Sequence, residues 1–398
     1  MSTITRTHPG LPAHLAQPAD PALLPTQDAE DLRAAVRAVL AARCEPTAVI
    51  ACYDGDRSVV TALWQALSVD LGLAGLLVEE EYGGHGATPR EAAVVLEELG
   101  AAVAPVPFLT SSVLATTVLT ASGDASGECA ELLAGLAAGE QVAALVLPWS
   151  TGPGAATTVA LEETGGEVRS VAGATEADVL LVPARAGRAG DAEERIEVRA
   201  VPVDSAEITA VSSLDMTRQL ADVRISAGAL AAAPVVVADA AAPIEDALVL
   251  AGALLAAEQA GLARWCVTTT LAYLKERRQF GRVLGGFQAL KHRLADLYVA
   301  AEQAGAAASW AAATASEPDA GTAEVRLAAA VASSYGSRVA VRAAEETVQL
   351  HAGIAMTWEH PAHLALKRAK SSQIALGTPE HHHHRVAVLV DLPGPATD

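Results

Sequence analysis

The feature that most constrains the fold is a change of hydrophobic pattern that occurs twice along the chain. Residues 28–140 and 243–398 carry apolar residues at helical spacing, whereas residues 141–242 hold short β-rich runs separated by Gly, Asp and Ser clusters. This order predicts an α+β multi-domain protein with an N-terminal helical domain, a small middle antiparallel β-domain with its joining segment, and a C-terminal four-helix bundle with a tail. Residues 1–27 are Pro-rich and predict a flexible N-terminal arm.

Local signals place some elements more closely. Thr88 followed by Pro89 is typical of a helix N-terminus, with Thr88 as the N-cap and a helix that runs to about Gly100. Strands are expected at residues 142–147, 157–161, 179–182, 196–203 and 220–225. The bundle helices are expected at residues 245–276, 288–314, 321–351 and 361–376.

The charge of the chain narrows the range of partners. It has 27 Lys and Arg against 47 Asp and Glu, which gives a formal net charge of −20 and argues against binding nucleic acid or an anionic membrane. An uncharged run at residues 99–123 contains Pro105 and Pro107, so buried helices are expected there rather than a membrane span. The scattered cysteines and the lack of an apolar leader are typical of a cytoplasmic protein with reduced thiols.

Three motifs occur in order along the chain. The first is Val-Glu-Glu-Glu-Tyr-Gly-Gly at 78–84 with Val-Leu-Glu-Glu-Leu-Gly at 95–100; the second is Glu-Arg-Arg-Gln-Phe-Gly at 276–281 with residues 287–296. The third is residues 349–360, which begin Gln-Leu-His-Ala-Gly. Together they resemble the acyl-CoA dehydrogenase family, in particular an actinobacterial lineage that is often heteromeric. The resemblance implies FAD as cofactor and an acyl-CoA thioester as substrate.

The same resemblance implies which residues contact FAD. It assigns the diphosphate to Arg277, and the adenine end to residues 349–353 across a subunit interface. The full set of expected cofactor residues is Arg277, Gln279, Phe280, Gln288, Gln349, Leu350, His351, Ala352 and Gly353. Physically, Arg277 lies where a helix ends before Gly281, so its fork of donors can reach outward to a diphosphate. Alternatively, Arg277 only balances the helix dipole and Gln288 is a plain surface amide. Ala352 stands where glycine is common, which predicts an altered loop.

The catalytic base of the family is missing. The resemblance implies a glutamate either in a Glu-Gly-Thr turn or on a helix about 26 residues before the motif arginine, and these positions hold Leu376 and Ala251. Glu258, two helical turns after Ala251, is a weak alternative base. In its structural interpretation, Glu258 is instead a bundle glutamate paired with Arg or Lys. His351 and the histidine run at 381–384 are further candidates. The run is expected to be a solvated segment, and no metal site is predicted.

The expected flavin-ring seat also departs from the family. Active members carry Thr-Glu-Pro followed by Gly-Ser-Asp, whereas residues 145–154 here read Leu-Val-Leu-Pro-Trp-Ser-Thr-Gly-Pro-Gly. Trp149 could stack on a ring or serve as core packing. The chain therefore resembles a degenerate subunit, without a flavin seat of its own.

Three functions remain open on the sequence. In the first, the chain is the subunit that completes the FAD site of a heteromeric acyl-CoA dehydrogenase, as a heterodimer or heterotetramer. In the second, it is a flavin-free binding or scaffold protein on the same fold. In the third, it is a self-sufficient flavoenzyme, for example a homo-oligomer, with Glu258 as a relocated base. The acyl group of the substrate is not determined by these residues.

Overall fold

The computed structural model describes residues 23–121, 127–186 and 195–394. Most of the predicted N-terminal arm lies outside the described residues. The N-terminal helices are α1 (Gln27–Arg43), α2 (Pro46–Ala51), α3 (Ser58–Gln65), α4 (Pro89–Ala101), α5 (Thr116–Thr120) and α6 (Glu128–Ala137), with a π-helical turn, η6 (Phe108–Ala115), before α5. The predicted start of α4 is confirmed, because Thr88 and Glu91 form a reciprocal capping box around Pro89.

The middle region consists of two small sheets. The first has the strand order β1 (Ala143–Leu145), β3 (Val179–Ala186), β4 (Arg195–Pro202) and β7 (Val235–Val237); the second has the order β2 (Gly165–Ala172), β6 (Leu220–Ser226) and β5 (Ala206–Val211). All pairs in these sheets are antiparallel except β1 with β3, which is parallel. The strand expected at 157–161 is wrong: a 3₁₀ turn, η7 (Ala156–Val159), lies there, and Leu161 makes only an isolated bridge.

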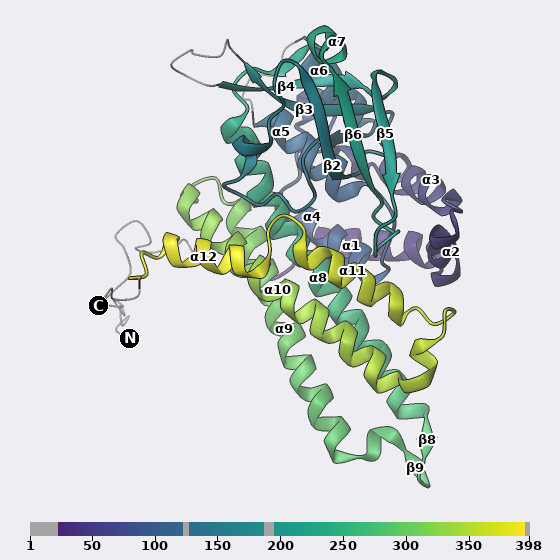
Figure 1. Ribbon diagram of the computed structural model, residues 1–398. Coiled ribbons are helices and arrows are strands. Elements are labelled where there is room, and N and C mark those ends of the chain that lie inside the picture. Colours follow the sequence, from purple (N-terminus) through teal and green to yellow (C-terminus); the bar gives the residue numbers. More distant parts are fainter. Residues whose placement is uncertain (1–22, 122–126, 187–194, 395–398) are drawn as a thin grey trace.

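The C-terminal region is the predicted helical bundle with one more helix. It contains α8 (Ala241–Glu276), α9 (Gln288–Ser316), α10 (Thr322–His351) and α11 (Ala362–Ile374), followed by α12 (Pro379–Leu389). A short helix, α7 (Ala227–Ala232), precedes β7, and a hairpin of β8 (Arg278–Gln279) and β9 (Arg282–Val283) joins α8 to α9. Figure 1 shows the two sheets at one end of the molecule and this hairpin at the other.

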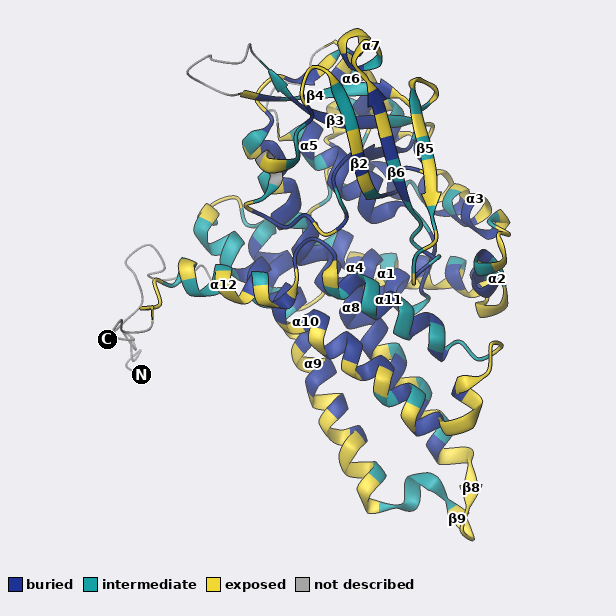
Figure 2. Ribbon diagram, viewed as in Figure 1, coloured by how far each residue is buried: buried dark blue, intermediate teal, exposed yellow. Residues whose placement is uncertain are grey.

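The helical regions share one core, which also takes in strand residues of the first sheet, and a second core lies in the middle region. Buried residues of α4, η6, α8, α9 and α10 form a single cluster, whereas residues of β1, β2, β3, β4 and β6 form a second one between the sheets. By length and composition α8 could cross a membrane. However, 89% of its apolar 18-residue stretch is buried inside the protein, as in the core helix of a soluble protein (Figure 2).

Two glycines let α4 and α8 approach until their backbones touch. A Cβ atom added to Gly100 would lie 2.0 Å from the carbonyl oxygen of Glu258, and one added to Gly261 would lie 1.9 Å from that of Glu97. No side chain fits at either position, so the crossing depends on glycine. This crossing fixes the N-terminal helices against the bundle next to the candidate site.

Candidate functional site

The second motif forms an exposed turn at the distal end of the bundle. Helix α8 ends at Glu276, and Arg277 follows with an extended backbone (ψ 126°). Phe280 and Gly281 both have positive φ angles, 52° and 76°, and close the β8–β9 hairpin. Arg277, Gln279 and Phe280 are exposed, and Phe280 is 85% exposed. The side chains that the motif assigns to FAD therefore point away from the chain's own core.

This distal turn is strongly positive although the chain as a whole is acidic. Residues 275–293 contain six Lys and Arg but only one acidic residue, Glu276. Among the described residues, Arg277 has no ion-pair partner, and the Arg282 guanidinium lies over the Phe287 ring at 4.1 Å. Unpaired guanidinium groups on an otherwise acidic protein suit a phosphate-bearing ligand, because each offers a planar fork of donors. The turn thus fits a diphosphate.

The other expected cofactor residues divide into two groups. Gln288, the first residue of α9, is exposed, and its amide lies 3.5 Å from the Nε2 atom of His292. Gln349, Ala352 and Gly353 are also exposed, at the end of α10. By contrast, Leu350 is buried in the bundle core, so only backbone atoms of this residue are placed to meet a ligand.

His351 turns inward rather than toward a ligand. Its Nδ1 atom lies 2.8 Å from the carbonyl oxygen of Thr347, and its ring stacks on Tyr273 at 4.5 Å. Burial lowers the pKa of His351, which keeps the ring neutral near pH 7. The side chain is therefore a packing element between α8 and α10.

Ala352 keeps a backbone conformation that glycine normally adopts. Its φ and ψ angles are 55° and −137°. The alanine expected to alter the loop is therefore accommodated with backbone strain, of the order of 1–3 kcal/mol for such regions. The loop that follows α10 keeps its exposed backbone despite the methyl group.

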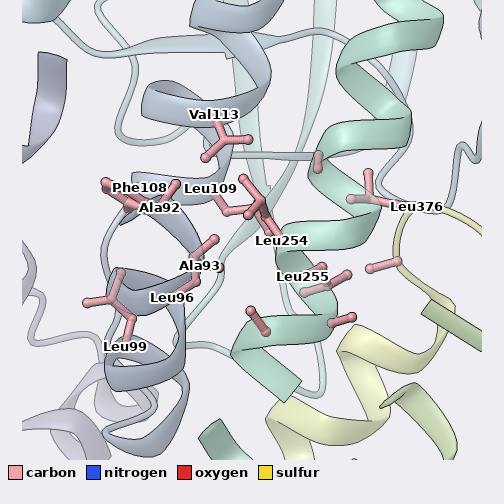
Figure 3. Packing of buried hydrophobic residues seen from close by; sticks show 14 of the residues in the cluster. Ala92, Ala93, Leu96, Leu99, Phe108, Leu109, Val113, Leu254, Leu255 and Leu376 are labelled. Carbon is pink, nitrogen blue, oxygen red and sulfur yellow. The ribbon is translucent and has the colours of Figure 1, made fainter. Parts of the chain in front are cut away.

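Both positions at which the sequence resemblance places a catalytic base lie in the apolar interior. Leu376 and Ala251 are 2% and 0% exposed. Leu376 has a positive φ angle of 53°; its backbone N–H donates to the Trp149 carbonyl at 2.9 Å, and its carbonyl lies 3.1 Å from the His382 Nε2 atom. Figure 3 shows Leu376 in the same packed cluster as Leu254 and Leu255 of α8. The turn at Leu376 has a strained backbone, but the leucine side chain cannot accept a proton.

Glu258 belongs to a buried network of four charged residues. Its carboxylate accepts hydrogen bonds from Arg218 at 2.6 Å and from Arg368 at 3.2 Å, and Arg368 also donates to Asp215 at 2.7 Å. All four side chains are at most 9% exposed. Burial alone would raise the pKa of Glu258, but the charges of Arg218 and Arg368 outweigh it and lower the pKa. A carboxylate held by two guanidinium groups is a poor base, which favours the structural interpretation of Glu258.

The segment at the expected flavin-ring seat packs directly on the C-terminal loop. Trp149 is 5% exposed, and the Arg218 guanidinium lies over its ring at 5.1 Å. A Cβ atom added to Gly152 would lie 3.0 Å from the Leu376 carbonyl oxygen, and His381 Nε2 is 3.0 Å from the Pro153 carbonyl oxygen. The residues at the expected flavin-ring seat therefore contact this chain's own C-terminal segment.

Two features of the site were missed on the sequence. Arg368 is fully buried among apolar neighbours of α11, and Asp215 and Arg218 come from the loop between β5 and β6. No local signal identifies them, since Arg368 lies about 150 residues after Asp215 and Arg218 in the chain. The histidine run was expected to be solvated, which is wrong for His382: it lies on α12, is buried, and burial lowers its pKa to about 4.

Comparisons with known proteins identify the family of the chain. Residues 26–140 match the acyl-CoA dehydrogenase N-terminal domain, and residues 243–388 match the C-terminal domain. The chain is 35% identical to the acyl-CoA dehydrogenase IpdE2 of Mycobacterium tuberculosis over 90% of its own length and 95% of that protein. The chain belongs to the acyl-CoA dehydrogenase family. This acyl-CoA dehydrogenase family member is also 35% identical to FadE34 of the same species, over 80% of its length and 41% of that protein.

Solved structures show the same fold. The chain superposes on a chain of the ChsE4–ChsE5 complex from Mycobacterium tuberculosis with a TM-score of 0.79 and 24% identity, covering 94% of this chain and 100% of that one. It superposes on a Tcur3481–Tcur3483 steroid ACAD variant with a TM-score of 0.77 and 26% identity, covering 92% and 98%. The superposition on a glutaryl-CoA dehydrogenase from Mycobacterium smegmatis in complex with FADH2 has a TM-score of 0.78 and 20% identity, and it covers 93% of this chain and 96% of that one.

Proposed function

We propose that this chain is the non-catalytic subunit of a heteromeric acyl-CoA dehydrogenase, and that it completes a FAD site seated mainly in a partner subunit. The observation that carries the proposal is a contrast within one chain. Arg277 is exposed and unpaired among the described residues, whereas both positions for the base, Leu376 and Ala251, are apolar and buried. The cofactor-facing half of the family's machinery is retained and the proton-abstracting half is absent.

The chemistry explains why the loss of the base matters. Oxidation of an acyl-CoA between Cα and Cβ needs a base to remove the α-proton, while bound FAD supplies the hydride acceptor. Leucine has no lone pair, and Glu258 is already held by two arginines. Leu376, Ala251 and Glu258 are thus not suited to take the proton.

Binding is the role that the remaining residues can perform. Arg277 would hold the diphosphate of FAD, and Gln288 would add an amide at the start of α9. The exposed backbone of residues 349–353 would lie along the adenine end. Support for a partner comes from the ChsE4–ChsE5 complex and the Tcur3481–Tcur3483 enzyme, whose names describe two different chains.

Co-expression with a catalytic acyl-CoA dehydrogenase chain, sought among the neighbouring genes, tests this proposal. We expect a mixed oligomer with about half the FAD per chain of a homotetramer, and reduction of that FAD by an acyl-CoA. A panel of fatty, branched and steroid side-chain thioesters would identify the substrate. Arg277→Ala should lower the FAD content without loss of the partner, whereas Arg342→Ala, an exposed arginine on α10, should not. A colourless complex, or full flavin in the chain alone, would refute the proposal.

A further inference from the structure

Three histidines lie close together where α10 ends and α11 begins. His351 is the last residue of α10, and a short 3₁₀ helix, η10 (Ala352–Met356), follows it. His360 precedes the start of α11 and His363 belongs to its first turn. The ring centroids of His351 and His360 are 4.9 Å apart. Imidazoles gathered on one loop can make that loop respond to pH in the range where histidine titrates.

His360 is bonded in a way that only a neutral ring allows. Its Nδ1 atom accepts a hydrogen bond from the backbone N–H of Ala362 at 3.2 Å. Ala362 is the first residue of α11, so this bond satisfies an N–H that the helix itself cannot pair. A protonated imidazole carries a hydrogen on both nitrogens and cannot accept. Protonation of His360 therefore breaks the bond between the loop and the start of α11.

His363 is also held in its neutral form. Its Nε2 atom lies 2.8 Å from the Trp358 carbonyl oxygen, and because a carbonyl only accepts, Nε2 carries the hydrogen. Its Nδ1 atom is buried and has no hydrogen-bond partner among the described residues. The Trp358 ring stacks on the imidazole at 4.6 Å. A proton on Nδ1 would add a buried charge without an acceptor, which is unfavourable.

The side chains from neighbouring elements do not favour a positive charge on these rings. Tyr273 of α8 stacks on His351 at 4.5 Å, and the Tyr53 ring lies 6.2 Å from that of His363. Lys367, one helical turn after His363, lies over the Tyr53 ring at 4.0 Å. Its charge opposes a second positive charge on His363.

The nearby carboxylates are not placed to compensate. Glu359 is exposed, and Asp215, which accepts a bond from the Tyr53 hydroxyl, is held by Arg368 at 2.7 Å. In the described part of the chain, the three rings bond only to backbone atoms. Burial, and then the neighbouring histidines, lower the pKa of His360, and burial lowers the pKa of His363. Both rings therefore resist protonation while the loop is closed.

We propose that His360 and His363 form an acid-sensitive latch, whose protonation releases residues 352–361 from α11 and opens the loop. Above the ordinary histidine pKa of about 6.5, both rings are neutral in either state of the loop, and the latch has its full strength. As the pH falls below this value, the open loop binds protons that the closed loop excludes, so closure weakens. The opening belongs to the chain itself; only its consequence for residues 349–353, the expected adenine contacts, rests on the proposed function.

Hydrogen–deuterium exchange of the full chain tests the latch. Peptides covering residues 352–361 are compared at pH 7.5 and 5.5, with each rate divided by that of the unfolded chain at the same pH. A ring with a pKa of about 6.5 in the open loop favours opening by up to about tenfold at pH 5.5. With two rings, we expect the protection of the loop to fall by about tenfold or more, whereas that of residues 297–312 in α9 should change by less than about threefold.

Two substitutions keep the hydrogen bonds and remove the titration. In His360→Asn the side-chain oxygen can accept from Ala362 in place of Nδ1, and in His363→Gln the side-chain amide can donate to Trp358 in place of Nε2. The double variant should protect the loop at pH 7.5 as the unchanged chain does, and it should lose the fall at pH 5.5. His85→Gln, at an exposed histidine of the N-terminal region, is the matched control and should keep the fall.

The unchanged chain alone can refute the latch, because equal protection of its loop at both pH values would contradict it without any variant. A fall that persists in the double variant, or one that residues 297–312 share, would also overturn the inference. A loop that opens in acid, in a chain that never takes up FAD with a partner, would refute the proposed function and leave this inference standing.

Discussion

Removal of the Glu258 charge tests the interpretation of the buried network. In Glu258→Gln, Arg368 would keep Asp215 as a carboxylate partner, whereas Arg218 would lose the carboxylate that pairs with it. Breaking a buried ion pair by removing one member costs about 3–5 kcal/mol, because an uncompensated charge stays buried. Glutamine keeps the size of the side chain and one acceptor, so we expect a loss at the lower end, about 3 kcal/mol in the free energy of unfolding.

Urea denaturation followed by tryptophan fluorescence measures this loss. The control is Glu345→Gln, which removes a carboxylate that is 54% exposed and paired with Lys370. Exposed pairs contribute at most about 1 kcal/mol, so the control should shift the transition little. If Glu258→Gln is no more destabilising than Glu345→Gln, the network does not stabilise the fold as argued.

The same variant also tests Glu258 as a relocated base. At a temperature at which Glu258→Gln stays folded, its complex with the partner should turn over acyl-CoA at a rate within about twofold of that of the unchanged complex. We expect this because Glu258 lies in the buried charged network and touches no substrate. A loss of 100-fold or more in a folded complex, as expected when a general base is removed, would assign the proton abstraction to Glu258.

Three further predictions follow from the site and its surroundings. Leu376→Glu should give no appreciable dehydrogenation in the isolated protein, because residues 145–154 lack the Thr-Glu-Pro and Gly-Ser-Asp residues expected to hold a flavin ring; flavin bleaching with acyl-CoA is the assay, and robust activity would contradict the degenerate-subunit proposal. The folded pKa of His382 is about 4, below its ordinary value of 6.5, so its contribution to stability is present above pH 6.5 and is lost as the pH falls toward 4. Between pH 7 and 4, the free energy of unfolding of the unchanged protein should therefore fall by about 2 kcal/mol more than that of His382→Gln, as measured by urea titration. Equal falls in the two proteins would disprove this role. Gly261→Ala should destabilise the protein by several kcal/mol or block folding, since the added methyl group meets backbone at 1.9 Å, whereas Gly305→Ala, at an open position of α9, should not; melting temperatures distinguish the two.

Much of the architecture could be predicted from the sequence because it depends on local pattern. Apolar residues at helical spacing predicted the bundle helices, and Thr88 with Pro89 predicted the start of α4. The middle sheets were harder: β2, β5 and β7 were missed, and a 3₁₀ turn was taken for a strand. Their residues are less regular in hydrophobic pattern, and pairing partners far away in the chain decide whether such segments become strands.

The candidate site shows the same division. The sequence by itself determined that Leu376 and Ala251 cannot act as bases, because residue type settles whether a proton can be accepted. It also predicted that Arg277, at the end of a helix, could reach a diphosphate. These conclusions need no coordinates.

Only the tertiary structure decided what the other groups do. It paired Glu258 with Arg218 and Arg368, residues 40 and 110 positions away. It also turned His351 into the bundle, where the sequence alone left it as a candidate ligand. The physical reason is that the charge state and accessibility of a buried group depend on which distant residues surround it, and folding alone brings those residues together.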